Sequence, residues 1–144
     1  MKGMLRISDA ASIGMHAMIY MAAWPGRLLA TAEVAEALHV SEAHLSKVLQ
    51  RLHRVGLVEA VRGPKGGFRL TVAPEECTLL RVFESIEGPL VESTCLLGLP
   101  KCDASDCCFG GVLAQVNRIV HEHLASTRLS DVSRIFGRVT GEKR

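Results

Sequence analysis

The spacing of apolar residues along the chain predicts a mainly helical protein with one small β-hairpin. Residues 9–24 place their apolar side chains on one face of a first helix, which ends at Pro25-Gly26. A short second helix begins at Thr31, which we expect to be its N-cap, and Ser41 caps a third helix. The apolar stripe of this third helix repeats every three or four residues and consists of Leu45, Val48, Leu49 and Leu52. A short helix, a tight turn and a longer basic helix together form a helix-turn-helix.

A β-hairpin follows this third helix. Two short apolar runs between Leu57 and Leu70 flank a basic tip that reads Arg62-Gly63-Pro64-Lys65-Gly66-Gly67. Glycine and proline in the tip favour a tight loop that can approach a ligand closely. A recognition helix followed by a cationic hairpin is typical of a winged-helix DNA-binding protein.

Two further helices are predicted downstream, separated by a loop that holds four of the five cysteines. We expect Pro74 to open a helix over residues 75–87 and Gly88-Pro89 to end it. The helix over residues 109–126 carries an apolar stripe of Val112, Val116, Ile119, Val120 and Leu124. This stripe exceeds what a small core needs, which favours a homodimer formed through the helix. A short helix around residues 130–136 is expected in the tail.

We therefore divide the chain into three parts. Residues 1–88 form a winged helix-turn-helix domain, residues 89–108 a cysteine-rich loop, and residues 109–144 a dimerisation helix with a tail. With 144 residues, of which 48% are hydrophobic, the chain is long enough for one folded domain.

The distribution of charge changes the picture more than the net charge of +2 does. Residues 41–70 contain six Lys or Arg against two acidic residues, whereas residues 71–110 contain two against seven. The basic block predicts a surface that faces phosphate groups. The apolar stretch near the N-terminus is interrupted by Asp9 and His16 and is too short to span a bilayer. We thus expect a cytoplasmic protein, in which cysteines indicate metal or redox chemistry rather than disulfides.

The third helix and the hairpin supply the candidate DNA-binding residues. Small or polar side chains in the first exposed turns let a helix enter the major groove, and a capped helix start offers backbone amides to a phosphate. We expect Arg51, Lys65 and Arg69 to contact phosphates and Arg62 to enter the minor groove. The candidates on the first turns of the helix are Ser41, Ala43, His44, Ser46 and Lys47.

The hairpin string that runs from Arg62 through Phe68 resembles that of the bacterial winged-helix regulators typified by IscR and NsrR. The resemblance includes Leu57-Val58 before the string, Glu87-Gly88 after the fourth helix, and the positions Val40-Ser41, Leu45, Leu52 and Gly56. It covers residues from about 4 to 127 and includes the cysteine loop. It implies a homodimer that binds a partly palindromic operator and, in many members, carries an iron–sulfur cluster.

The resemblance also implies a set of cluster ligands. Cys95, Cys102 and a third cysteine match the family's loop, and the spacing favours Cys108 over Cys107 for the third position. Some members place a histidine three residues later, where this chain has Gly111 (or Gly110). The fourth ligand is then either Asp9, which matches a carboxylate that NsrR-like members supply from the other subunit, or the remaining cysteine. Both alternatives favour a 4Fe-4S cluster over a 2Fe-2S cluster.

Other interpretations of these residues stay open at this point. Asp9 also suits a helix N-cap, and the loop cysteines also suit free thiols or a structural zinc site. Cys77 lies in an apolar pattern and is expected to be a buried structural residue. His121 and His123 are two positions apart on a helix, so they do not share a face, and we expect surface or interface roles for both.

These patterns favour a transcriptional regulator, more specifically a repressor, whose DNA affinity changes when its cluster is lost, oxidised or nitrosylated. The alternative is a winged-helix regulator that uses the same cysteines as a cluster-free thiol switch or zinc site. A thiol redox enzyme is disfavoured because the chain lacks a fitting Cys-x-x-Cys pair and a catalytic base. We expect neither an enzymatic activity nor a small-molecule substrate.

Overall fold

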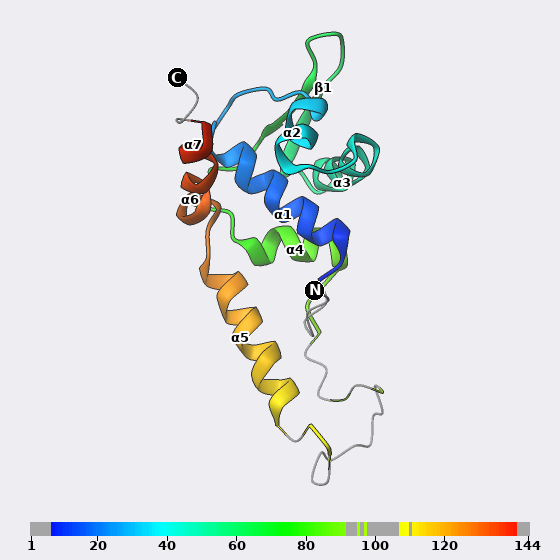
Figure 1. Cartoon of the computed structure of the whole chain (residues 1–144), viewed down its shortest axis with the longest axis vertical. Coiled ribbons are helices and arrows are strands. Elements are labelled where there is room, and N and C mark those ends of the chain that lie inside the picture. Colours follow the sequence, from blue (N-terminus) through cyan, green and yellow to red (C-terminus); the bar gives the residue numbers. More distant parts are fainter. Residues whose placement is uncertain (1–6, 92–94, 96, 98–106, 110, 141–144) are drawn as a thin grey trace.

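The computed structural model describes residues 7–91, 95, 97, 107–109 and 111–140. Within these residues the helices and strands follow in the order α1 (Asp9–Ala22), α2 (Thr31–Leu38), α3 (Glu42–Arg54), β1 (Val58–Val61), β2 (Gly67–Leu70), α4 (Leu79–Glu87), α5 (Val112–Ser126), α6 (Leu129–Val132) and α7 (Arg134–Thr140). In Figure 1, α1 crosses the middle of the body, and the hairpin and α5 extend from opposite ends. The predicted class, mainly helical with a small antiparallel hairpin, is confirmed.

Helix α1 is the centre of the core. It packs against α3, α4 and α6 and buries most of its surface, with Ala11, Ala17 and Met18 fully inaccessible. At Gly14 an added Cβ would lie 2.1 Å from Ile86 Cδ1, so the tip of this α4 side chain packs where a larger residue would have its Cβ. The sequence predicted apolar side chains on one face of this helix, whereas the structure buries residues around most of its circumference and leaves Asp9 and His16 exposed. No helix in the part of the chain that the structure describes is both long and apolar enough to cross a membrane.

Helices α2 and α3 form the predicted helix-turn-helix. The turn is made by His39, which adopts a left-handed conformation (φ 53°), and by Val40, whose N–H bonds the Ala35 carbonyl at 3.0 Å. Ser41 caps α3 as predicted, because its hydroxyl accepts from the His44 N–H at 3.3 Å. The prediction for α2 was wrong. Its N-cap is Ala30, which has no side-chain acceptor, and Thr31 is the first helical residue.

The hairpin pairs β1 and β2 in antiparallel register from Val58 opposite Leu70 to Val61 opposite Gly67. Leu29 adds a short third pairing that the sequence did not reveal, with two backbone hydrogen bonds of 2.9 Å to Phe68. This pairing requires a glycine at position 67, because a Cβ there would lie 2.1 Å from the Leu29 carbonyl oxygen. The hairpin is therefore fixed to the loop that precedes α2.

Helix α4 begins later than predicted. Pro74 belongs to a turn closed by a 2.9 Å hydrogen bond from the Glu76 N–H to the Ala73 carbonyl, and the helix starts at Leu79 after the N-cap Thr78. The stretch before the helix is extended because Leu129 and Thr127 bond the backbone of Cys77 and Leu79, each at 2.9 Å. These long-range bonds override the helical pattern. Cys77 is fully buried, as predicted.

Helix α5 begins at Val112, close to its predicted start, and leaves most of its apolar stripe uncovered. Leu124 is buried, whereas Val112, Val116 and Ile119 are 53%, 38% and 65% exposed. The expected tail helix is present as α6 and α7. The rings of Phe136 and Tyr20 pack edge to face with their centroids 5.3 Å apart, which holds α7 against α1.

Candidate functional site

The outer face of α3 presents the residues predicted to face DNA. Ala43, Lys47 and Arg51 are exposed, and His44 and Ser46 are half-buried at the edge of this face. The opposite face is buried through the predicted stripe of Leu45, Val48, Leu49 and Leu52. The helix is therefore fixed in the core by one side and free to enter a groove with the other.

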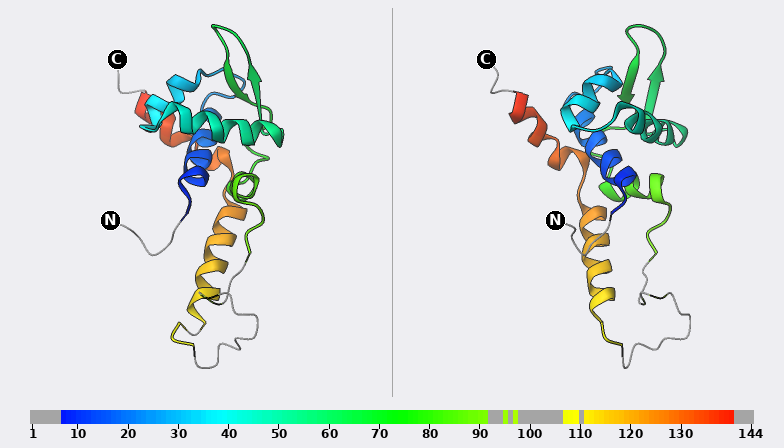
Figure 2. Two further views of the ribbon diagram at one scale, coloured as in Figure 1. Left: turned by 90° about the vertical axis from the view of Figure 1, so that its right-hand side faces the viewer. Right: turned by 45° about the vertical axis from the view of Figure 1, so that its right-hand side comes forward.

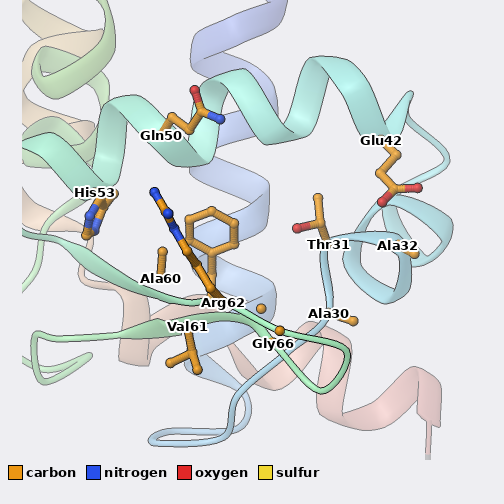
Figure 3. A pocket seen from close by; sticks show the side chains of 13 residues that line it. Ala30, Thr31, Ala32, Glu42, Gln50, His53, Ala60, Val61, Arg62 and Gly66 are labelled. Atoms are coloured by element: carbon orange, nitrogen blue, oxygen red, sulfur yellow. The ribbon is translucent and has the colours of Figure 1, made fainter.

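A groove of about 610 Å³ lies between α3, the hairpin and the start of α2. In Figure 3 the Arg62 side chain extends toward α3 and ends between Gln50 and His53. Glu42 lies at the other end of the groove. The structure thus places the predicted minor-groove arginine beside the recognition helix, whereas Lys65 is exposed at the tip of the hairpin.

Short-range bonds hold the hairpin in place relative to α3. The Leu57 N–H bonds the Leu52 carbonyl at 3.0 Å, and the Thr71 hydroxyl donates to the Gly56 carbonyl. His53 adds a side-chain bond from its Nδ1 to the Val58 carbonyl at 3.0 Å. These bonds fix the angle between the recognition helix and the hairpin, which a DNA-binding surface needs to match adjacent grooves.

Arg69 has a nearby counter-charge. It lies opposite Glu59 in the hairpin register, and its Nε donates to the Glu59 carboxylate. Both side chains are partly exposed, so the pair contributes little to stability. A phosphate contact by Arg69 would have to compete with this carboxylate.

The cysteine segment is described in part. Cys95 and Cys107 are half-buried and Cys108 is exposed, while Cys102 lies outside the described residues. Within the described residues of a single chain, no three histidine, cysteine or acidic side chains lie close enough together to bind one metal ion. The predicted ligand set remains a prediction.

The donor chemistry of this segment suits an iron–sulfur cluster, since thiolates are strong ligands for iron. Cys77 is unsuited to this role, because burial raises the pKa of its thiol and favours the protonated form. The side chain of Cys108, in contrast, is accessible.

Asp9 is not the N-cap of α1, so that alternative is wrong. Ser8 is the N-cap, and its hydroxyl accepts from the Ala11 N–H at 3.0 Å. Asp9 is the first helical residue and is exposed. It lines a cavity of about 350 Å³ together with Ser41 and His44, the residues that begin α3.

The start of α1 is also connected to the end of α4. The Ser8 hydroxyl donates to the carboxylate of Glu87, the last residue of α4. Glu84 accepts from the Leu90 N–H at 3.2 Å, which holds the first residues beyond α4. The end of α4 is therefore held beside the start of α1.

Comparison with known proteins decides the family. Residues 7–134 match the family model Rrf2, described as an iron-dependent transcriptional regulator. The chain belongs to the Rrf2 family. Rrf2 proteins are DNA-binding transcriptional regulators rather than enzymes, which confirms the resemblance to IscR-like regulators and the expectation of no enzymatic activity.

Among curated relatives, the chain is 36% identical to the HTH-type transcriptional regulator BadM of Rhodopseudomonas palustris over 83 residues. That alignment covers 58% of this chain and about half (53%) of BadM. The chain is also 36% identical to protein aau3 of Rhizobium meliloti over 105 residues, which are 72% of this chain and 68% of aau3.

Solved structures with this fold include two bacterial regulators. CymR, the global cysteine regulator of B. subtilis, superposes with a TM-score of 0.75 at 26% identity over 92% of this chain and 98% of CymR. IscR of T. potens superposes with a TM-score of 0.68 at 26% identity over 89% of this chain and 85% of IscR. The similarity confirms the winged-helix fold, including the hairpin.

The sequence analysis missed part of this groove. Glu42, Gln50 and His53 line it and were assigned no role. The helical repeat contained a usable signal, because Glu42 and His53 are three turns apart and so share a face of α3. What the sequence did not reveal is that this face lies opposite Arg62.

Proposed function

We propose that this Rrf2 protein is a homodimeric transcriptional repressor whose operator affinity is controlled by an iron–sulfur cluster. The proposal rests on the groove that α3 and the basic hairpin form together. The chain that presents this groove belongs to a family described as iron-dependent transcriptional regulators. The proposed cluster ligands are Cys95, Cys102 and Cys108, with Asp9 or Cys107 as the fourth, and a 4Fe-4S cluster is favoured.

The exposed face of α3 supports major-groove binding. Ala43, Ser46 and Lys47 are small or polar enough to approach base edges, and Arg51 and Lys65 are exposed and carry positive charge toward phosphates. Ser41 and His44 begin the helix, where backbone amides are available to an anion.

The exposed stripe of α5 supports a dimer. Val112, Val116 and Ile119 form an apolar row at i, i+4 and i+7 on a helix that extends away from the body (Figure 2). A second copy of the same helix would cover this row and place two recognition helices on one duplex. Half-sites about 34 Å apart would then match the two-fold symmetry of a palindromic operator.

A bound cluster would supply a group that reacts with oxidants or nitric oxide. The residues of the chain would relay its presence to α3. Glu87 and Ser8 join the end of α4 to the start of α1, and Asp9 shares a cavity with Ser41 and His44. If Asp9 coordinated a cluster bound by the partner subunit, the change at Asp9 would therefore act on the start of α3.

Iron, sulfide and zinc content, measured with a visible spectrum on protein purified without oxygen, tests the cluster. We expect about four iron and four sulfide per chain and a broad band near 400 nm. Cys95→Ser and Cys102→Ser should lose the band, and comparison of Cys107→Ser with Cys108→Ser identifies the third ligand. Cys77→Ala is the matched control and should keep the band. Retained iron in Cys95→Ser would contradict the ligand set.

The alternative function is a cluster-free thiol switch or zinc site. The adjacent Cys107 and Cys108, of which Cys108 is exposed, favour it, as does the similarity to the S. aureus CymR, whose structure is known in an oxidized form. Zinc or free thiols without iron in the same analysis would select this alternative.

A further inference from the structure

The hydrogen bond of His53 fixes which of its ring nitrogens carries a proton. Nδ1 lies 3.0 Å from the Val58 carbonyl oxygen. A carbonyl oxygen only accepts hydrogen bonds, so Nδ1 must be the donor. In the neutral ring, Nε2 then carries a lone pair and cannot donate. Protonation converts Nε2 into a positively charged donor.

The ring of His53 stands at the open groove between α3 and the hairpin. Arg62 and Gln50 lie beside it in Figure 3. When α3 occupies a major groove and the hairpin the adjacent minor groove, the strand that separates the two grooves must pass between these elements. This step rests on the proposed DNA-binding function.

We propose that the groove holds the sugar–phosphate backbone of one DNA strand and that His53 binds a phosphate through protonated Nε2. Neutral Nε2 would present its lone pair to an anionic oxygen, so binding takes up a proton at this ring. Because binding takes up a proton, DNA affinity is then higher at low pH than at high pH.

The charges around His53 favour this role. Arg62 faces it from the hairpin, while Glu42 lies at the far end of the groove on α3. On the hairpin, Glu59 is bonded to Arg69, and the part of α2 that lines the groove contributes no charged side chain among the described residues. A phosphate would therefore lie between two cationic groups, Arg62 and protonated His53.

Phosphate contacts are independent of sequence, so a mixed-sequence 30-bp duplex serves as the probe. Affinity is measured by fluorescence anisotropy at pH 8 and pH 6 across a salt series. We expect wild type to bind about tenfold more tightly at pH 6. Its slope of log affinity against log salt should steepen by about 0.9, corresponding to one added phosphate contact.

Two substitutions separate the role of Nε2 from that of Nδ1. His53→Asn keeps a donor for the Val58 carbonyl but has no group at the position of Nε2, so it should lose this pH response. His53→Gln places a neutral amide donor near Nε2 and should bind with an intermediate affinity, without the pH response that His53 contributes. His16→Asn is the matched control, because His16 Nδ1 also contacts a backbone carbonyl (Ser12, 2.7 Å) but lies on α1.

If His53→Asn kept the full pH response of the wild type, the proposal that His53 binds a phosphate would be wrong. Wild-type binding that is tight but equal at both pH values would also overturn it and leave the proposed function intact. If the wild type bound no DNA at pH 6 and none at pH 8, both the proposed function and this inference would be overturned.

Discussion

Arg62 and Lys65 are three positions apart in the chain but lie in different places: Arg62 is in the groove beside α3, and Lys65 is exposed at the tip of the hairpin. Arg62→Ala should weaken specific binding by about 1–3 kcal/mol. Lys65→Ala should weaken binding to all sequences alike and reduce the salt slope by about one. Anisotropy titrations with specific and mixed-sequence duplexes measure both. Arg81→Ala on α4 is the control, and equal, salt-independent losses from both variants would contradict this division.

Gly67 is required by the approach of Leu29. A Cβ at position 67 would lie 2.1 Å from the Leu29 carbonyl oxygen, so Gly67→Ala should separate the Leu29–Phe68 pairing. We expect a loss of about 1–3 kcal/mol in the free energy of unfolding, measured by urea denaturation. Gly137→Ala on α7 is the control, because nothing lies within 4 Å of its Cβ position. An unchanged stability of Gly67→Ala would refute this packing argument.

Cys77 makes stability depend on pH. Burial raises the pKa of its thiol, an effect that Arg81 partly offsets. A raised pKa in the folded state means that the folded protein holds the proton more tightly. The stabilisation is therefore complete below the ordinary thiol pKa of about 8.5 and is lost as pH rises through the folded value.

Urea denaturation under reducing conditions at pH 7.5 and pH 9.5 tests this effect. Wild type and Cys108→Ala should lose stability between the two pH values, and Cys77→Ala should lose less. This range lies below the titration of Tyr20, whose pKa is also raised by burial. An identical loss in Cys77→Ala and wild type would show that Cys77 is not the source.

At the scale of elements, periodicity predicted α1, α3 and α5 well because each carries a long apolar repeat or a side-chain cap. Errors occurred where distant backbone bonds decide the structure. Cys77 and Leu79 are bonded by Leu129 and Thr127, so α4 begins after them, and the Leu29 pairing depends on a residue almost forty positions away. Such contacts leave no local pattern in the sequence.

The exposed apolar row of α5 can be tested as the interface of the proposed dimer. Ile119→Asp places a charge in the exposed apolar row and should convert the proposed dimer into a monomer by sedimentation analysis, since a carboxylate is costly to bury. Ala125→Asp is the control, because Ala125 is exposed on a different face of α5. A dimer that persists in Ile119→Asp would place the interface elsewhere.

At the scale of the whole molecule, the spatial arrangement of the proposed DNA-binding residues could be predicted from the sequence more fully than that of the proposed cluster ligands. The residues of α3 and the hairpin are close in sequence, so helical and strand periodicity nearly fix their arrangement. The proposed ligands come from Asp9 and from a segment almost ninety residues later, so helical and strand periodicity do not predict how they come together.

The central claim is that the cluster controls operator affinity. The most direct test titrates a duplex from the promoter of the protein's own gene with cluster-loaded protein and with the same preparation after anaerobic removal of iron. We predict dissociation constants that differ by at least tenfold, with a difference that Cys95→Ser abolishes. Equal affinities of the two forms for this duplex would contradict the account.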